Sequence, residues 1–227
     1  MSDTLSQFDS ALALCRDIFD KKLRDYGASW RIMRPRSITD QLYIKAKRIR
    51  TLEEEEAMVD EGVLGEFMAI INYGLVGLIQ LQLGYADNAD ITPDHAMALY
   101  DEKMKTARDL MAAKTHDYGD AWRGMRVNSY TDFILTKIQR VKEIEGNSGH
   151  TIISEGIDSN YLDIINYAVF AVITLTQADC HISPPATRTA LSSGCGVAAA
   201  HTHRRDFHHV GLCHRPRPVG QCHKNQR

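Results

Sequence analysis

The strongest constraint in this sequence is that it contains the same segment twice. Residues 25–48 and 117–140 are related by a shift of 92 positions, and 12 of the 24 aligned residues are identical. A second block, residues 61–73 and 155–167, repeats at a shift of 94 and ends in Ile-Ile-Asn-Tyr in both copies. This period is longer than the unit of a solenoid protein, so it indicates duplication of a larger supersecondary unit.

The first predicted helix of each copy has apolar residues at spacings of three and four, over residues 4–24 and 94–115. It ends at a Tyr-Gly pair, where Gly27 and Gly119 can adopt the left-handed conformation that closes a helix without a Cβ clash. A loop that carries Trp-Arg-x-Met-Arg follows in both copies. Each copy is therefore predicted to open with a helix and a tryptophan-containing loop.

The second predicted helix starts near Ser37 in the first copy and Ser129 in the second. It extends to about residues 51 and 144. An aspartate follows each serine by three positions, which resembles a capping box with Asp in place of Glu. We therefore expect these serines to cap the helices.

The third predicted helix, over residues 63–83 and 157–177, is apolar on nearly all sides. Such a helix belongs in a core. Its apolar stretch is shorter than the roughly 20 residues that cross a bilayer, and Asn72 and Gln80 interrupt it. We therefore expect a buried helix and no membrane partner.

These elements predict an all-α protein, a tandem duplication of a three-helix unit with six main helices and pseudo-twofold symmetry. The first repeat is assigned to residues 1–92 and the second to residues 93–178, both in one globular domain. Residues 179–227 hold seven of the ten His and four of the five Cys, with no helical or strand periodicity and no paired zinc-ligand spacing. This segment is predicted to be a disordered tail, either native or the product of a shifted reading frame.

The formal charge of −2 conceals a division, because residues 1–178 carry −7 and residues 179–227 carry +5. An acidic folded part disfavours extensive binding of duplex nucleic acid. Charged residues interrupt any apolar run at the start, so no signal peptide is expected. Only Cys15 precedes residue 180, which argues against a disulfide framework. These features predict a cytoplasmic protein, and they are compatible with a homo-oligomer.

A tryptophan and two arginines recur together in each loop, and a Lys-x-x-Arg pair recurs on each second helix. A base can stack on an indole ring, and arginine can bind phosphate oxygens in a bidentate manner. An asparagine within each third helix can contact a nucleobase edge. A nucleotide or another phosphorylated small molecule is the predicted partner. The candidate binding residues are Trp30, Arg31, Arg34, Lys45, Arg48, Asn72, Trp122, Arg123, Arg126, Lys137, Arg140 and Asn166.

Each of these residues also has a structural explanation. A tryptophan in a loop between helices can pack into the core, and the arginines can pair with Asp25, Asp40 or Glu61. Asn72 and Asn166 can pair with each other, or with Tyr or Arg, where the two copies meet. The two explanations differ in whether the shared side chains face a cavity.

The second copy has two acidic residues, Asp158 and Asp163, where the first has Leu64 and Ala69. Glu155, Asp158 and Asp163 project to one side of its third helix. Glu-x-x-Asp is a spacing that can hold Mg²⁺ together with waters and a substrate phosphate. Mg²⁺ is thus the one candidate cofactor, with Glu155 and Asp158 as ligands and Asp163 as a third ligand or general base. The helix dipole also favours acids near a helix start.

The string Asp-Tyr-Gly-x-x-Trp-Arg, followed by Ser-x-x-Asp, Lys-x-x-Arg and Ile-Ile-Asn-Tyr, resembles a small bacterial and phage family. This is the nucleotide-modification-associated α-helical domain, long catalogued as a domain of unknown function. The resemblance covers about residues 5–177 in both copies. It implies an α-helical protein with a role in nucleotide or DNA-base modification.

The chain is also distantly similar to the all-α nucleoside triphosphate pyrophosphohydrolases. Those enzymes use Glu-x-x-Glu and Glu-x-x-Asp on adjacent helices to hold Mg²⁺, and Glu155-Gly-Ile-Asp158 matches only the second of these. Three hypotheses follow. The protein is a nucleotide-binding protein, a Mg²⁺-dependent pyrophosphohydrolase, or a non-catalytic helical interaction module.

Overall fold

Each Tyr-Gly pair ends a helix in the computed structural model, as the sequence predicts. The structure describes residues 2–54 and 62–182. Gly27 has φ of 67° and Gly119 has φ of 63°. Their amides donate to the carbonyl groups of Leu23 and Thr115, each at 2.9 Å. These left-handed glycines stop the first helix of each copy, so the chain turns into the tryptophan loop at the same place in both.

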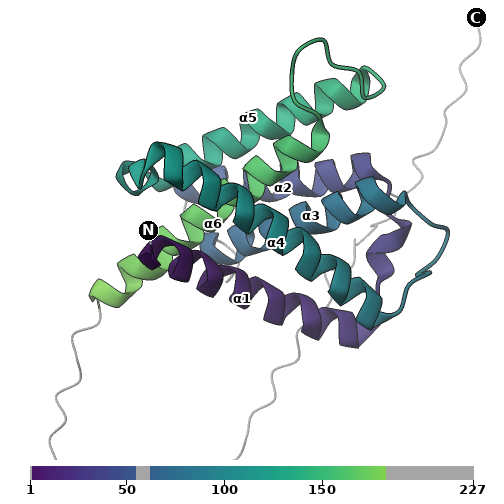
Figure 1. Cartoon of the computed structure of the whole chain (residues 1–227), viewed down its shortest axis with the longest axis horizontal. Helices are drawn as coiled ribbons and strands as arrows, with labels where there is room; N and C mark the ends of the chain where they lie inside the picture. Colours follow the sequence, from purple (N-terminus) through teal and green to yellow (C-terminus); the bar gives the residue numbers. More distant parts are fainter. Residues whose placement is uncertain (1, 55–61, 183–227) are drawn as a thin grey trace, which may run out of the picture. The chain divides into compact units, whose positions relative to one another are not determined.

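In the described residues, each copy consists of three α-helices and one short 3₁₀ helix, and no strand occurs there. The prediction of an all-α, duplicated three-helix fold is confirmed. The first copy contains α1 (Ser2–Tyr26), η1 (Ser29–Ile32), α2 (Pro35–Glu54) and α3 (Val63–Leu83). The second copy contains α4 (Pro93–Tyr118), η2 (Ala121–Gly124), α5 (Val127–Gly146) and α6 (Ile157–Ile182), as Figure 1 shows.

The two third helices, α3 and α6, form the centre of the bundle. The helices α1 and α4 pack on one side of this pair, and α2 and α5 pack on the other. Two glycines of α3 permit the close approach of α6. A Cβ atom at Gly77 would lie 2.4 Å from Cε2 of Tyr161, and one at Gly74 would lie 2.7 Å from Cγ1 of Ile165.

By length and composition alone, α3 is the one helix of the described part that could cross a membrane. Helices in the cores of water-soluble proteins meet the same two criteria. In this bundle, 61% of the apolar window of α3 is buried against other helices. Its apolar character is therefore explained by its central place between α2, α4 and α6.

The helices α2 and α5 meet through contacts that the repeat makes reciprocal. The hydroxyl of Thr39 on α2 donates to Oε1 of Glu145 on α5 at 2.7 Å. The hydroxyl of Thr131 on α5 donates to Oε1 of Glu53 on α2, also at 2.7 Å. Each pair is the other shifted by 92 positions, so the predicted pseudo-twofold symmetry is present in individual side-chain contacts.

The predicted capping boxes are wrong. The helices start at Pro35 and Val127, two residues before the serines, and no side chain caps the start of α5. The aspartates of the predicted boxes form ion pairs across the α2–α5 interface instead. These pairs are Lys142 with Asp40, at 2.9 Å, and its repeat counterpart, Arg50 with Asp132.

Both copies lie in one compact unit, Met1–Pro185. The last helix, α6, continues to Ile182, beyond the end predicted for the second repeat at residue 178. The tail predicted to be disordered falls outside the described residues from position 183 onward.

Candidate functional site

A pocket of about 360 Å³ lies beside Trp30 in the first copy, between α1, η1 and α3. We call it the Trp30 pocket. Aromatic, amide and ammonium groups line it together with aliphatic side chains. The lining residues that matter most for its chemistry are Lys22, Tyr26, Trp30, Asn72, Tyr73 and Val76.

Two buried polar side chains hold the tryptophan loop of the first copy in place. Nε2 of Gln80 donates to the carbonyl oxygens of Arg31, at 3.0 Å, and Met33, at 2.6 Å. The guanidinium of Arg31 is 3% exposed and pairs with Asp90 at 2.7 Å. That hydrogen bond holds the pKa of the Asp90 carboxyl below its usual range. Arg31 therefore fixes the loop and does not face the pocket as a phosphate ligand.

The corresponding indole of the second copy is covered. Trp122 is 7% exposed, and its ring stacks on Phe170 with centroids 4.5 Å apart and planes at 9°. The guanidinium of Arg123 lies 4.4 Å from the centroid of the same indole. Phe170 occupies the repeat position of Val76. In the second copy, this larger side chain covers the indole, whereas in the first copy Val76 lines the Trp30 pocket.

The remaining loop arginines serve different contacts in the two copies. Arg123 donates to the hydroxyl of Thr4 on α1 at 2.8 Å, which ties η2 to the first helix. Arg34 is exposed, and its guanidinium lies 5.7 Å from the centroid of Tyr85. Arg126 is exposed at the start of α5. The predicted cluster of one indole and two guanidinium groups around a ligand does not form in either loop.

Both members of the Lys-x-x-Arg pair of α2 bind one carboxylate of the first copy. Nζ of Lys45 lies 3.1 Å from Oε2 of Glu66, and Arg48 pairs with the same carboxylate. Glu66 is 3% exposed, and a buried carboxylate requires such partners. Lys22, which lines the Trp30 pocket, makes no ion pair with any residue that the structure describes.

The matching pair of α5 has a different acidic partner. Nζ of Lys137 lies 2.6 Å from Asp163, and Lys114 pairs with the same carboxylate, which is 9% exposed. Burial, the largest single effect, raises the pKa of Asp163, but the hydrogen bonds from the two lysines bring it below its usual range. Asp163 occupies the repeat position of Ala69. Arg140 makes no ion pair within the described ranges 2–54 and 62–182.

The two central asparagines differ in their partners. The hydroxyl of Tyr100 on α4 donates to Oδ1 of Asn72 at 2.6 Å. Asn166 is buried, and neither its oxygen nor its nitrogen has a hydrogen-bond partner among the described residues. The repeat position of Tyr100 is Phe8 on α1, which lacks the hydroxyl. The predicted pairing of an asparagine with tyrosine is therefore found in the first copy, and Asn72 and Asn166 do not pair with each other.

Both copies of the repeat match one family of known proteins. Residues 22–81 and 114–175 each match the family described as nucleotide modification associated domain 1, and together they span more than half of the chain. The chain belongs to this family. The resemblance stated from the sequence is thereby confirmed in both copies. No curated protein and no solved structure matches the chain.

In this member of the nucleotide modification associated family, the three candidate metal residues do not converge. Asp163 is held by two lysines, Glu155 lines a pocket with Arg140, and Asp158 lines a separate one. No group of three or more His, Cys, Asp and Glu in the described residues is placed to hold a metal ion. The three candidate ligands therefore form no common Mg²⁺ site among the described residues.

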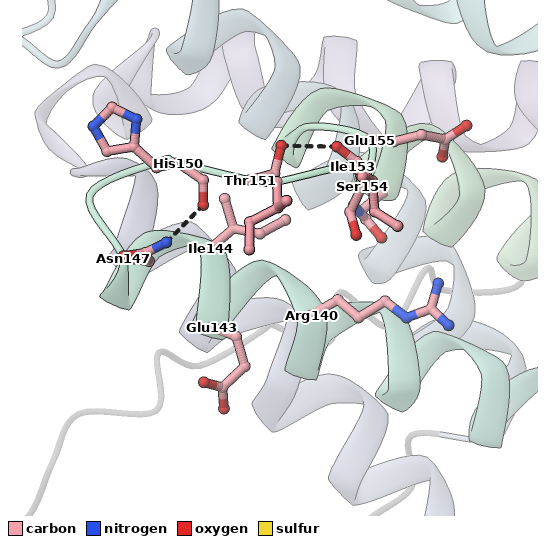
Figure 2. Close-up of a pocket in the computed structure, with 11 residues that line it drawn as sticks. Arg140, Glu143, Ile144, Asn147, His150, Thr151, Ile153, Ser154 and Glu155 are labelled. Carbon is pink, nitrogen blue, oxygen red and sulfur yellow. Dashed lines mark hydrogen bonds between the residues drawn. The ribbon is translucent and has the colours of Figure 1, made fainter.

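A second pocket, of about 770 Å³, lies between α5 and residues 147–156, as Figure 2 shows. Arg140 lines the pocket from α5, and Glu155 lines it from the segment before α6. The hydroxyl of Thr151 donates to the carbonyl of Ser154 at 2.8 Å and shapes this segment. No tryptophan, tyrosine or phenylalanine lines this pocket. Its one aromatic ring is the imidazole of His150, which is a smaller stacking surface than the indole and phenol rings of the Trp30 pocket.

Several residues of the Trp30 pocket were not identified from the family member's sequence. Lys22 has a repeat counterpart in Lys114, so an alignment extended three residues toward the N-terminus would have found it. The difference between Val76 and Phe170 is visible in the aligned copies, but only the structure shows that it opens one pocket and closes the other.

Proposed function

We propose that this protein binds a nucleotide in the Trp30 pocket of its first copy. The observation that carries the proposal is that one cavity is lined by an indole, an amide and the ammonium group of Lys22, which has no ion-pair partner among the described residues. Its volume of about 360 Å³ lies within the roughly 300–1,000 Å³ typical of small-molecule sites. Membership in the nucleotide modification associated family supports the same class of ligand.

The walls of the pocket suit a nucleobase. Trp30, Tyr26 and Tyr73 provide aromatic surface, and stacking of a base on an aromatic side chain contributes about 1–3 kcal/mol. Nε1 of Trp30 is buried without a hydrogen-bond partner in the described residues. Asn72 accepts a hydrogen bond from Tyr100 through Oδ1, which leaves its Nδ2 group as a donor to a base edge. A base would therefore find both stacking and hydrogen-bonding groups.

Lys22 adds recognition of charge. It lies on α1 at the edge of the pocket and has no carboxylate partner in the described residues. Its counterpart Lys114 is paired with Asp163, so the ammonium group at this position is neutralised in the second copy alone. A negatively charged ligand would supply the missing partner in the first copy.

The test is a fluorescence titration of the variant Trp122→Phe, in which Trp30 is the only tryptophan. The four 2′-deoxynucleoside 5′-monophosphates serve as probes. We expect at least one of them to quench the emission of Trp30 in a saturable manner, because a stacked base contacts the indole directly. The reciprocal variant, Trp30→Phe, retains Trp122 beneath Phe170 and should show no saturable response.

Two lysine variants complete the experiment. Lys22→Met should weaken binding, because it removes the ammonium group that lines the pocket. Lys21→Met is the matched control, since Lys21 is the adjacent residue and is already paired with Asp17 at 2.5 Å. A response of Trp30 that is absent for every probe, or equal losses in both lysine variants, would contradict nucleotide binding at this site.

A further inference from the structure

The ion-pair cluster of the second copy joins one side chain from each of its three helices. Lys114 comes from α4, Lys137 from α5 and Asp163 from α6. The carboxylate of Asp163 is buried between the two ammonium groups, at 2.6 Å from that of Lys137. The second copy thus contains an anion site that is filled by one of its own side chains.

The same three positions in the first copy hold Lys22, Lys45 and Ala69. Both lysines are retained, and only the acid has been replaced by a methyl group. Lys22 and Ala69 both line the Trp30 pocket. Lys45 pairs with Glu66, which lies one turn before Ala69 on α3. By the repeat, the place that corresponds to the Asp163 carboxylate lies over Ala69, on a wall of the pocket that Lys22 also lines. Lys45, the counterpart of Lys137, is held by Glu66 and does not itself line the pocket.

We propose that the first copy binds the phosphate group of the nucleotide at this place, over Ala69 and between Lys22 and Lys45. The inference rests on the proposed function and adds to it the position of the anionic group. The side chain of Asp163 marks that position, because it is an oxyanion held by the equivalent lysines in the same fold.

The charges of the first copy agree with this assignment. Glu66 carries one negative charge and already has two cationic partners, Lys45 and Arg48. Lys22 adds a further positive charge without an acidic partner in the described residues. A phosphate monoester carries about −1.5 to −2 charges at pH 7. It would balance the excess positive charge and could accept hydrogen bonds from both ammonium groups.

The test compares each 2′-deoxynucleoside 5′-monophosphate with the matching nucleoside, again through Trp30 in the Trp122→Phe background. Both should bind through the base, and the monophosphate should bind roughly tenfold more tightly or better, as expected for charge-assisted hydrogen bonds. Ala69→Asp places a carboxylate between the lysines. In this variant, the monophosphate should lose its advantage over the matching nucleoside, with both affinities measured in the same variant.

Ala69→Asn is the matched control, because it has nearly the same size as aspartate but no charge. It should retain most of the preference for the monophosphate. The melting temperature of Ala69→Asp should not fall below that of Ala69→Asn, since its carboxylate pairs with the lysines as Asp163 does. If Ala69→Asp does not fold, Lys22→Met provides the same comparison, with an expected loss of the preference for the monophosphate.

The outcomes separate the inference from the proposed function. Equal affinities for nucleoside and monophosphate in the wild-type pocket, or equal losses in Ala69→Asp and Ala69→Asn, would overturn the phosphate position while base binding stands. A complete absence of response to nucleosides and monophosphates alike would overturn both. If inorganic phosphate by itself quenches Trp30 as strongly as a monophosphate does, that result would also contradict nucleotide binding.

Discussion

The two copies share the course of the backbone, but the tryptophan of the first copy lines a pocket and that of the second is covered. In the first copy, Val76 leaves space next to Trp30, and a pocket of about 360 Å³ results. In the second copy, Phe170 stacks on Trp122 and removes that space. The exchange of an aliphatic for an aromatic residue at this position is therefore one difference between the open pocket of the first copy and the covered indole of the second.

The acids differ in a similarly simple way. Each copy has three cations at equivalent positions on its first and second helices, and one buried acid on its third helix. In the first copy the acid is Glu66, which pairs with the Lys-x-x-Arg motif. In the second it is Asp163, which lies one turn further along the aligned helix and pairs with the first-helix lysine as well.

The closely packed second copy and the open pocket of the first are combined in one duplicated fold. The reciprocal contacts of α2 and α5 require both copies, so neither copy can be lost without losing the interface. The closed second copy contributes stability through stacking and ion pairs. The first copy keeps an open pocket lined by Lys22, for which residues 2–54 and 62–182 offer no acidic partner.

The largest effect is expected from making the first copy resemble the second. Val76→Phe should fill the Trp30 pocket as Phe170 fills its counterpart, and should reduce nucleotide affinity by roughly 100-fold or more. Titration of Trp30 fluorescence in the Trp122→Phe background measures this loss. The melting temperature is the control, and it should change little because the new ring enters existing space. Unchanged affinity would mean that nucleotides do not use this pocket.

The reverse change should affect stability instead. Phe170→Val removes the stacking partner of Trp122 and leaves a cavity beside it. We expect a loss of about 2 kcal/mol in the free energy of unfolding, measured by urea denaturation. Val76→Ala is a useful comparison, because its side chain already borders a cavity and should cost less. An equal cost for the two variants would argue that the second copy is no more tightly packed than the first.

Substitutions beside the two central asparagines should have smaller effects on the free energy of unfolding, with opposite signs in the two copies. Tyr100→Phe removes the hydroxyl that donates a hydrogen bond to Oδ1 of Asn72, and should destabilise the protein by about 1 kcal/mol. Phe8→Tyr supplies the missing hydroxyl on the side of Asn166 and should stabilise it by a comparable amount. Urea denaturation of both variants measures the two effects. Destabilisation by Phe8→Tyr would show that Asn166 does not face Phe8 as Asn72 faces Tyr100.

The smallest effect concerns pH. The pKa of Asp163 is lower in the folded protein than the roughly 3.9 of an unfolded aspartate. The unfolded state therefore binds the proton more readily. The stability contributed by this carboxylate is complete above the unfolded pKa and is lost as the pH falls through the folded pKa.

Asp163→Asn should accordingly show a shallower loss of stability below about pH 4 than the wild-type protein does. Thermal melting across an acidic pH series measures the slope. Asp158→Asn, at an exposed carboxylate of the same helix, is the matched control. Parallel pH profiles for wild type and Asp163→Asn would contradict the assigned ion pairs with Lys114 and Lys137.

Much of the fold could be predicted because its signals are local. Apolar spacing located the six helices, and Gly27 and Gly119 marked the ends of two of them. The starts of α2 and α5 were mispredicted because Ser-x-x-Asp is also compatible with a position inside a helix. The aspartates of that motif form ion pairs with the opposite helix, and a sequence motif does not contain that information.

The candidate site was only partly predictable. Trp30 and Asn72 were identified because both copies retain them, and they do line one pocket. Arg31 and Arg123 were identified by the same criterion, but they hold the loops in place. Retention in both copies does not distinguish a ligand contact from a structural contact, since the duplicated fold requires both kinds.

The sequence by itself determined that this protein is a doubled helical bundle of the nucleotide modification associated family, because periodicity and repetition are properties of the chain. Only the tertiary structure decided which copy has an indole beside a pocket, and which lysine has no carboxylate partner in the part of the chain that the structure describes. Those outcomes depend on side chains from three different helices meeting at one point. Residues such as Phe170 and Asp163 act on partners that are distant in sequence, and packing alone determines whether they reach them.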